Sequence, residues 1–202
     1  MRVCVLLLAT LLAACSRQTP PPRTAASAHW QRAIHDDDRQ RLAGLWTAWT
    51  RSLAEAQAAG QGAAVKALGP VAMPEAAYAA PFPLPGSYRC RTLKLGRQGQ
   101  GGVLSSGPFQ ACTLAVDDKG ALRFQQQVSG RRVAGRLYPD GDRMVFLGSM
   151  ALQQETGVMP YGADDVRDQV GVLRAFGDRR WRLELPWPRW ESTLDLIEIV
   201  AG

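Results

Sequence analysis

The sequence of 202 residues predicts an α+β protein, in which an N-terminal helical segment packs on an eight-stranded antiparallel β-meander. Between residues 36 and 56 apolar residues recur at steps of three, four and seven, which indicates an amphipathic helix. After residue 86 the apolar period becomes two, and turn residues separate short segments, which indicates strands. The 20 glycines and 13 prolines also favour many short elements.

Residues 1–14 have the features of an export signal. Arg2 provides a positive start, and residues 3–14 are almost continuously apolar but shorter than the roughly 20 residues of a membrane span. The four residues LAAC at 12–15 resemble the lipobox of bacterial lipoproteins. This resemblance implies that residues 1–14 are removed and that Cys15 is lipidated. An ordinary secretory leader cut near Ala14, or a chance apolar start on a cytosolic chain, is the alternative.

Residues 15–27 predict a lipid-anchored tether. Three consecutive prolines at 20–22 favour an extended chain of about 3 Å per residue. Several acyl chains on one cysteine anchor a protein firmly to a membrane. Ser16 rather than Asp follows Cys15, as in lipoproteins sent on to the outer membrane. We therefore expect an anchor in the inner leaflet of the outer membrane and a folded part that faces the periplasm.

Residues 28–69 form the predicted helical segment. Residues 28–35 add a helical turn, and the acidic run 36–38 then caps the main helix and favours its N-terminal dipole. The apolar stripe of the main helix consists of Leu42, Leu45, Trp46, Trp49, Leu53 and Ala56. A short second helix covers 63–68. The five prolines of residues 70–86 exclude a helix, so we expect an extended connector over the surface.

The β-domain covers residues 87–202. Its predicted strands are 87–95, 109–116, 122–128, 133–138, 144–152, 169–176, 181–185 and 194–200. Turn signals such as DKG at 118–120 and GD at 177–178 separate them. Eight strands in meander order close naturally into a small lipocalin-like barrel that can enclose one small ligand. A β-sandwich is the alternative.

The cysteines of the β-domain predict a disulfide. With Cys4 in the leader and Cys15 lipidated, Cys90 and Cys112 remain, and two thiols in an oxidising compartment pair most simply with each other. Two cysteines without a nearby His supply only half of a zinc site. The bond would staple the Gly-rich excursion 96–107, which lacks the helix and Lys of a phosphate-binding loop.

The sequence contains no convincing catalytic constellation. His29 and His35 both precede the main helix, so no histidine-based triad is expected in the β-domain. The predicted loop 153–168 carries three aspartates, Asp164, Asp165 and Asp168. They suit paired-carboxylate chemistry or weak Ca²⁺ binding, but polar turn residues with Asp168 paired to an arginine are the favoured interpretation. We therefore expect neither an enzyme nor a cofactor or metal.

Arg89 and Arg91 share one side of the first predicted strand with Leu93 and Leu95. If that side faces the core, one or more arginines point into the barrel unless a bulge resets the register. A buried guanidinium then needs a partner. The favoured partner is a carboxylate, and the candidates are Asp168, Glu184 and Glu191. The alternative is a polar ligand such as a carboxylate or phosphate.

Trp187, Arg189 and Trp190 are further candidate contacts for a partner. Pro186 and Pro188 interrupt strand pairing around them, and Trp and Arg are frequent in protein interfaces. The favoured alternative is that the rings pack against the N-terminal helix, which also presents tryptophans. The site prediction thus consists of contacts only, with no catalytic, cofactor or metal residue.

Several segments resemble one family of exported bacterial proteins. They are PGSYRCRTLKLG at 85–96, GRLYPD at 135–140, FLG at 146–148, YG at 161–162, RDQVGV at 167–172, RWRL at 180–183, PRWES at 188–192 and the helix segment LWTAW at 45–49. Together they resemble the family grouped as domain of unknown function 4893. The resemblance covers most of the mature chain and implies no activity.

Three functional hypotheses follow. The favoured one is an outer-membrane-anchored, periplasm-facing, non-catalytic binding module for an envelope protein or a small amphiphile. The others are an inhibitor of an exported protease or lytic enzyme, by analogy of architecture, and a hydrolase that uses acidic residues. The net charge of +6 does not indicate nucleic-acid binding, because basic and acidic residues are interleaved.

Overall fold

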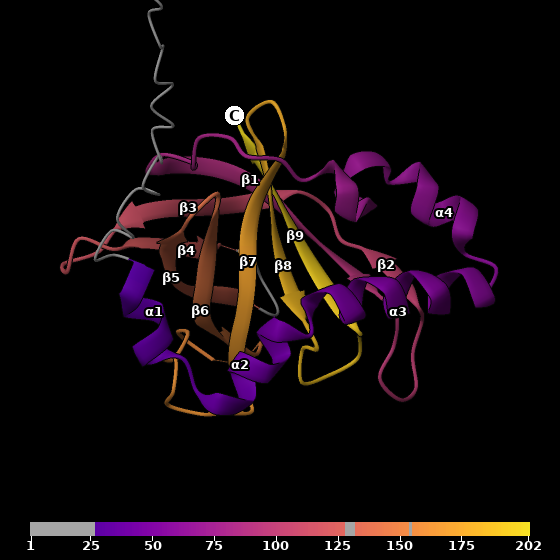
Figure 1. Ribbon diagram of the computed structural model, residues 1–202, viewed down its shortest axis with the longest axis horizontal. Helices are drawn as coiled ribbons and strands as arrows, with labels where there is room; N and C mark the ends of the chain where they lie inside the picture. The colour runs from indigo at the N-terminus through magenta and orange to yellow at the C-terminus, as the bar shows by residue number, and fades with distance from the viewer. Residues whose placement is uncertain (1–26, 128–131, 154) are drawn as a thin grey trace, which may run out of the picture.

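The structure is a computed structural model that describes residues 27–127, 132–153 and 155–202. Its helices lie at the N-terminal end and cover one side of a β-barrel (Figure 1). They are α1 (Ser27–Ala33), α2 (Asp36–Ala43), α3 (Leu45–Ala58) and α4 (Gly62–Ala67), followed by the 3-10 helices η1 (Gly69–Ala72) and η2 (Pro74–Ala76). Helices that pack on a β-barrel confirm the α+β class. None of the helices in the described residues has the length and apolar character of a membrane span.

The strands form one antiparallel sheet that closes on itself. They are β1 (Gly86–Leu95), β2 (Leu104–Ser106), β3 (Gln110–Val116), β4 (Leu122–Gln126), β5 (Arg132–Asp140), β6 (Arg143–Ala151), β7 (Asp168–Gly177), β8 (Arg180–Pro186) and β9 (Leu194–Ala201). β1 pairs with β3 on one side and with β9 on the other, from Leu95–Leu194 to Tyr88–Ala201. This closure confirms the eight-stranded meander barrel and excludes the β-sandwich.

The additional strand β2 lies outside the closed barrel. Among the described strands its one partner is the end of β1, from Leu93–Ser106 to Leu95–Leu104. The sequence analysis missed it because three residues within a Gly-rich excursion carry no clear alternation. The predicted strand 122–128 is also shorter among the described residues, since β4 ends at Gln126.

The predicted disulfide between Cys90 and Cys112 is confirmed. It joins β1 to β3 with a Cα–Cα distance of 5.9 Å, and both cysteines are buried. Tyr88 pairs with Cys112 and Cys90 with Gln110, so the bond is diagonal across the ladder. In the chain-entropy model a closed loop of this size stabilises the fold by about 3 kcal/mol.

Side chains pack the barrel interior. The rings of Phe124 and Phe146 meet edge to face, with centroids 6.3 Å apart. Gly135 faces Gly148 beside these rings, and a Cβ on Gly135 would lie 2.3 Å from Gly148 Cα, so only glycine fits. Other members of this cluster are Cys90, Cys112, Leu114, Val133, Leu137, Met144, Met150, Leu173, Leu183, Leu185, Ile197 and Ile199. Eight strands leave an interior just wide enough for such filling.

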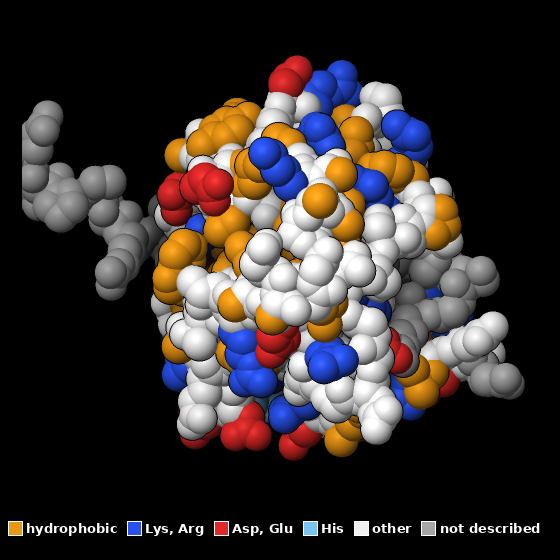
Figure 2. All heavy atoms as spheres, turned by 90° about the vertical axis from the view of Figure 1, so that its right-hand side faces the viewer, with side chains coloured by type: hydrophobic (Ala, Val, Ile, Leu, Met, Phe, Trp, Pro, Cys, Tyr) orange, Lys and Arg blue, Asp and Glu red, His pale blue; other side chains and the backbone are white. Residues whose placement is uncertain are grey.

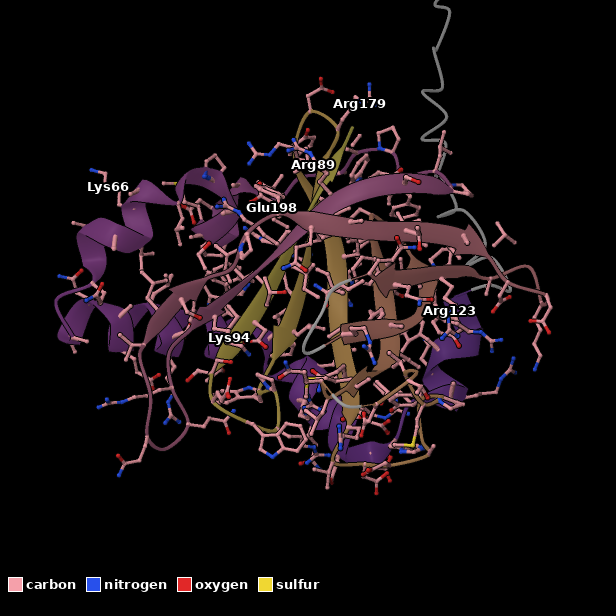
Figure 3. All side chains as sticks on the ribbon, turned by 180° about the vertical axis from the view of Figure 1, so that it is seen from behind. Lys66, Arg89, Lys94, Arg123, Arg179 and Glu198 are labelled. Carbon is pink, nitrogen blue, oxygen red and sulfur yellow. A yellow bond between two sulfur atoms is a disulfide. The ribbon has the colours of Figure 1, made fainter. Side chains whose placement is uncertain are left out.

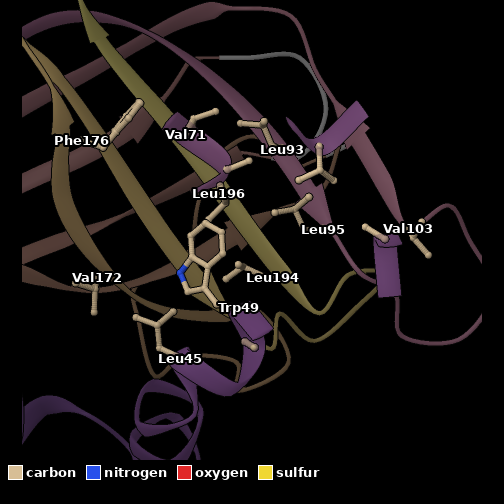
Figure 4. Packing of buried hydrophobic residues seen from close by; sticks show 14 residues of the cluster. Leu45, Trp49, Val71, Leu93, Leu95, Val103, Val172, Phe176, Leu194 and Leu196 are labelled. Carbon is tan, nitrogen blue, oxygen red and sulfur yellow. The ribbon is translucent and has the colours of Figure 1, made fainter. Parts of the chain in front are cut away.

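A second core lies between the helices and the outer wall of the barrel. Trp49 is at its centre, among Leu45 of its own helix, Val71 of η1 and the β9 residues Leu194 and Leu196 (Figure 4). The outer face of the neighbouring strand β1 adds Leu93 and Leu95 to this cluster. A smaller cluster packs α1 on β6 and β7, through Trp30, Ile34, Val145, Leu147 and Val170.

The helical segment and the connector differ locally from prediction. The predicted main helix breaks at Gly44 into α2 and α3. A Cβ on Gly44 would lie 2.9 Å from Trp187 Nε1. The acidic residues 36–38 form the first turn of α2 instead of preceding it, and His35 is the N-cap residue. The connector begins with 3-10 turns, and Val71 and Ala72 are buried, so its first part is not an extended surface segment.

Arg182 joins the barrel to the helices and the connector. It lies on β8, is fully buried, and donates to Glu184 Oε1 from Nε at 3.0 Å and from Nη2 at 2.8 Å. Its Nη1 donates to the carbonyls of Val71 at 2.9 Å and Met73 at 2.8 Å. The Trp49 ring lies 4.6 Å from the guanidinium carbon, and Trp49 Nε1 donates to Glu184 Oε2 at 3.0 Å.

Replacing Arg182 by Ala should lower the free energy of unfolding by about 3–5 kcal/mol, because Glu184 would stay buried without its counterion. Urea unfolding followed by circular dichroism measures this change. Arg123→Ala, on the outer wall of β4, is the matched control, with an expected change within about 0.5 kcal/mol. Equal effects of the two substitutions would contradict the structural role of Arg182.

Candidate functional site

Arg89 and Arg91 lie on the outer face of β1, so the prediction that arginines point into the barrel is wrong. Leu93 and Leu95 share this face, but the helical segment covers them there, so no bulge is needed. Beyond the helices the face is open, and Arg89 is exposed. Figure 3 shows Arg89 close to Glu198 on this wall, and Arg91 Nε donates to Glu198 at 2.6 Å.

These arginines also contact an aromatic ring. The guanidinium carbons of Arg89 and Arg91 lie 5.4 Å and 4.9 Å from the centroid of Phe109. Glu198, the ion-pair partner of Arg91, is not among the three predicted carboxylates, because it comes from β9, which meets β1 only through barrel closure. On the side of the molecule seen in Figure 2, basic side chains lie among acidic, apolar and uncharged ones.

Asp168, Trp187 and Arg189 come together beside α2. Asp168 begins β7 and is fully buried. Arg41 of α2 donates from Nη1 to the Asp168 carbonyl at 3.0 Å and to Asp38 Oδ1 at 2.7 Å, and from Nε to the Trp187 carbonyl at 3.0 Å. Arg189 Nη2 lies 4.0 Å from Asp38 Oδ1. The network fixes α2 against the long loops at this end of the barrel.

His35 completes a group of three possible cation ligands. Its Nδ1 lies 3.6 Å from Asp165 Oδ1 and 3.7 Å from Asp168 Oδ2, and the three donor atoms are within 4.8 Å of one another. Imidazole and carboxylate are donor types that divalent transition metals accept. Asp164, which the sequence grouped with these aspartates, instead accepts from the Val166 backbone N–H at 3.0 Å.

Sequence reasoning missed His35 because only the fold brings α2 next to the loop before β7. The one signal in the sequence is its position directly before the acidic run 36–38. Arg189 brings a positive charge to the same place, since its Nη2 lies 3.9 Å from Asp37 Oδ2 and its Nε donates to the backbone carbonyl of Asp165 at 3.2 Å.

Burial shifts several pKa values in this network. Burial raises the pKa of Asp168, and so do the negative charges of Asp38 and Asp165. The hydrogen bond from the Gly162 N–H and the nearby His35 lower it, but burial is the largest effect. Burial also raises the pKa of Tyr161, whose hydroxyl donates to Asp38 Oδ2 at 2.7 Å. Such shifts occur both at functional sites and in structural ion-pair networks.

The two tryptophans of the β8–β9 loop are half-buried. Trp187 packs on the core beneath the helices, and its Nε1 donates to the Gly44 carbonyl at 3.2 Å. Trp190 packs on the interior cluster, with the Arg167 guanidinium carbon 5.7 Å from its ring centroid. Trp187 thus makes the ring packing on the helices that the sequence analysis favoured, whereas Trp190 packs elsewhere.

A cleft of about 390 Å³ lies between α1–α3 and the outer faces of β6, β7 and β8. Its apolar lining is Trp30, Leu42, Ala43, Leu45, Trp46, Trp49 and Pro74, and its charged lining is Arg39, Arg143, Arg174 and Glu184. The volume lies within the roughly 300–1,000 Å³ of small-molecule sites. Trp46 was predicted to lie in the packed stripe, but it is 66% exposed.

Sequence reasoning did not find this cleft, because its lining comes from separate helices and strands.

The chain matches a known protein family over a range that includes all the residues lining the cleft. A family model described as a domain of unknown function, DUF4893, matches residues 30–199. The chain belongs to the DUF4893 family. No curated protein and no solved structure matches it.

In this DUF4893 protein the raised pKa of Asp168 predicts a pH dependence of stability. The folded state holds the Asp168 proton to a higher pH than the unfolded state, so this group stabilises the fold at low pH. Its contribution is lost as the pH rises from the ordinary value near 3.8 through the raised one. Asp168→Asn should therefore flatten the decline in unfolding free energy above pH 4, measured by urea titration. The exposed Asp142→Asn is the control, and parallel profiles for Asp168→Asn and the unsubstituted chain would contradict the assignment.

Proposed function

We propose that this DUF4893 protein is a lipid-anchored, non-catalytic binding module of the bacterial envelope, which takes a small amphiphile in the cleft beside α3. The cleft suits the ligand better than the barrel interior, because packed side chains occupy the interior. The lining of the cleft combines tryptophan and leucine side chains with charged groups, which suits a ligand with an apolar and a polar part.

The exposed Trp46 is the observation that carries the proposal. A large ring that is 66% exposed at a cleft, while Trp49 one helical turn later is buried, leaves apolar surface in water. Trp30 and Leu42 line the same cleft from α1 and α2. Covering such surface with an apolar chain is favourable by about 25 cal/mol per Å².

The location in the envelope rests on the sequence. Cys15, the predicted lipidation site, and most of the predicted tether 15–27 lie outside the described residues. The first described helix starts at Ser27, so a stretch of chain separates the predicted anchor from the fold. We propose the inner leaflet of the outer membrane as the position of the anchor, with the barrel in the periplasm.

Trp46→Ala should weaken amphiphile binding at least about tenfold, which corresponds to a loss of about 1.5 kcal/mol or more of ring burial. Isothermal titration calorimetry with dodecyl maltoside and dodecanoate, each below its micelle-forming concentration, measures the affinities. Leu84→Ala removes another exposed apolar side chain, 75% exposed and outside the cleft lining, and should leave binding unchanged. If neither amphiphile binds, the proposed function is wrong and an envelope-protein partner becomes the better hypothesis.

Cys15→Ser should release the protein from the membrane fraction and abolish incorporation of radiolabelled palmitate, because the thiol that accepts the lipid is absent. Cys4→Ser, in the part of the leader that is predicted to be removed, is the control and should change neither. Retention of the Cys15→Ser protein in the outer-membrane fraction at the level of the unsubstituted chain would contradict the anchor.

A further inference from the structure

A row of three guanidinium groups crosses the strands below the cleft. Arg174 of β7 faces Arg182 of β8 in the register of the sheet. On its other side, Met144 and Leu173 form the last pair of the β6–β7 ladder, so Arg143 is the next position opposite Arg174. Like charges that face each other directly destabilise a sheet, so the row requires negative charge.

The two outer members of this row have their own carboxylates. Arg182 Nη2 donates to Glu184 Oε1 at 2.8 Å, and Arg143 Nε donates to Asp140 Oδ2 at 3.0 Å. Arg174 lies between them, half-buried, and makes no hydrogen bond, ion pair or ring contact with any residue that the structure describes. Within the described part of the chain, the central cation of the row is therefore the one without a counterion.

Both carboxylate oxygens of Glu184 already accept hydrogen bonds from residues other than Arg174. Its Oε1 accepts from Arg182 and its Oε2 accepts from Trp49 Nε1 at 3.0 Å. Arg39 adds another positive charge from α2, and its own contacts are the Gln31 carbonyl at 2.8 Å and Asp36 at 3.9 Å. The cleft thus has an apolar wall on the helices and a surplus of positive charge towards the strands.

We propose that the ligand of the cleft is an anionic amphiphile, whose carboxylate or phosphate head binds Arg174 and whose apolar chain lies against Trp46. This inference rests on the proposed function and adds the charge and the orientation of the ligand. A guanidinium binds such oxyanions through two parallel N–H donors, and the bond is stronger where water is partly excluded. The neighbouring Arg143 and Arg39 favour the same head group through their charge.

The test compares ligands that share a chain and differ in the head. Residues 16–202 without acyl groups contain every helix and strand of the structure and are titrated with dodecanoate, dodecyl maltoside and dodecyltrimethylammonium. Dodecanoate should bind at least about tenfold more tightly than the neutral maltoside, as expected for a hydrogen bond to a charged group. The cationic amphiphile should bind most weakly. Dodecyl phosphate is expected to behave as dodecanoate does.

Arg174→Gln should weaken dodecanoate at least about tenfold and leave the affinity for dodecyl maltoside unchanged. Arg123→Gln, on the outer wall of β4 (Figure 3), removes the same charge elsewhere and should change neither affinity. Thermal unfolding separates binding from folding. A cation that faces two others and has no counterion among the described residues should be removable without lowering the melting temperature.

Equal binding of dodecanoate and dodecyl maltoside, both weakened by Trp46→Ala, would overturn the anionic head and leave the amphiphile cleft standing. Unchanged dodecanoate affinity in Arg174→Gln would overturn the role of Arg174. A lower melting temperature of Arg174→Gln, together with equally weakened binding of all three ligands, would show that Arg174 has a structural role. That outcome would overturn the inference as well. Absence of binding by every amphiphile would overturn the proposed function together with the inference.

Discussion

The buried ion pair of Arg182 and Glu184 is the interaction on which the arrangement of helices and barrel depends. One guanidinium meets the carboxylate on its own strand and the carbonyls of the connector, and it stacks on the central tryptophan of α3. A buried arginine without these acceptors would cost several kcal/mol. The connector therefore has to turn back over β8, and its 3-10 turns present their carbonyls there.

The same ion pair shapes the candidate site. Glu184 accepts from Arg182 and Trp49, and among the described residues no carboxylate pairs with Arg174. Trp49 fills the core while Trp46, one position after Leu45, remains at the open side of α3. The contact that holds the helices on the barrel thus lies beside the cleft, because Glu184 and Trp49 belong to both.

The barrel has an apolar cluster on each side of its wall. Inward side chains such as Phe124 and Phe146 fill the interior, and outward side chains such as Leu93 and Leu194 form the core beneath the helices. This explains why β1 combines arginines and leucines on one face. The leucines lie where helices cover the wall, and the arginines lie where solvent and Glu198 meet it.

The sequence by itself determined the eight barrel strands, their meander order and the pairing of Cys90 with Cys112, because period-two alternation, turn residues and cysteine count are local or compositional signals. The export and lipidation signals are of the same kind, and they remain predictions. Only the tertiary structure decided that the sheet closes, that Arg89 and Arg91 face outwards, and that His35 meets Asp168. The cleft also belongs to this second group, because Trp46 and Arg174 become neighbours only when α3 packs across the outer wall of the barrel.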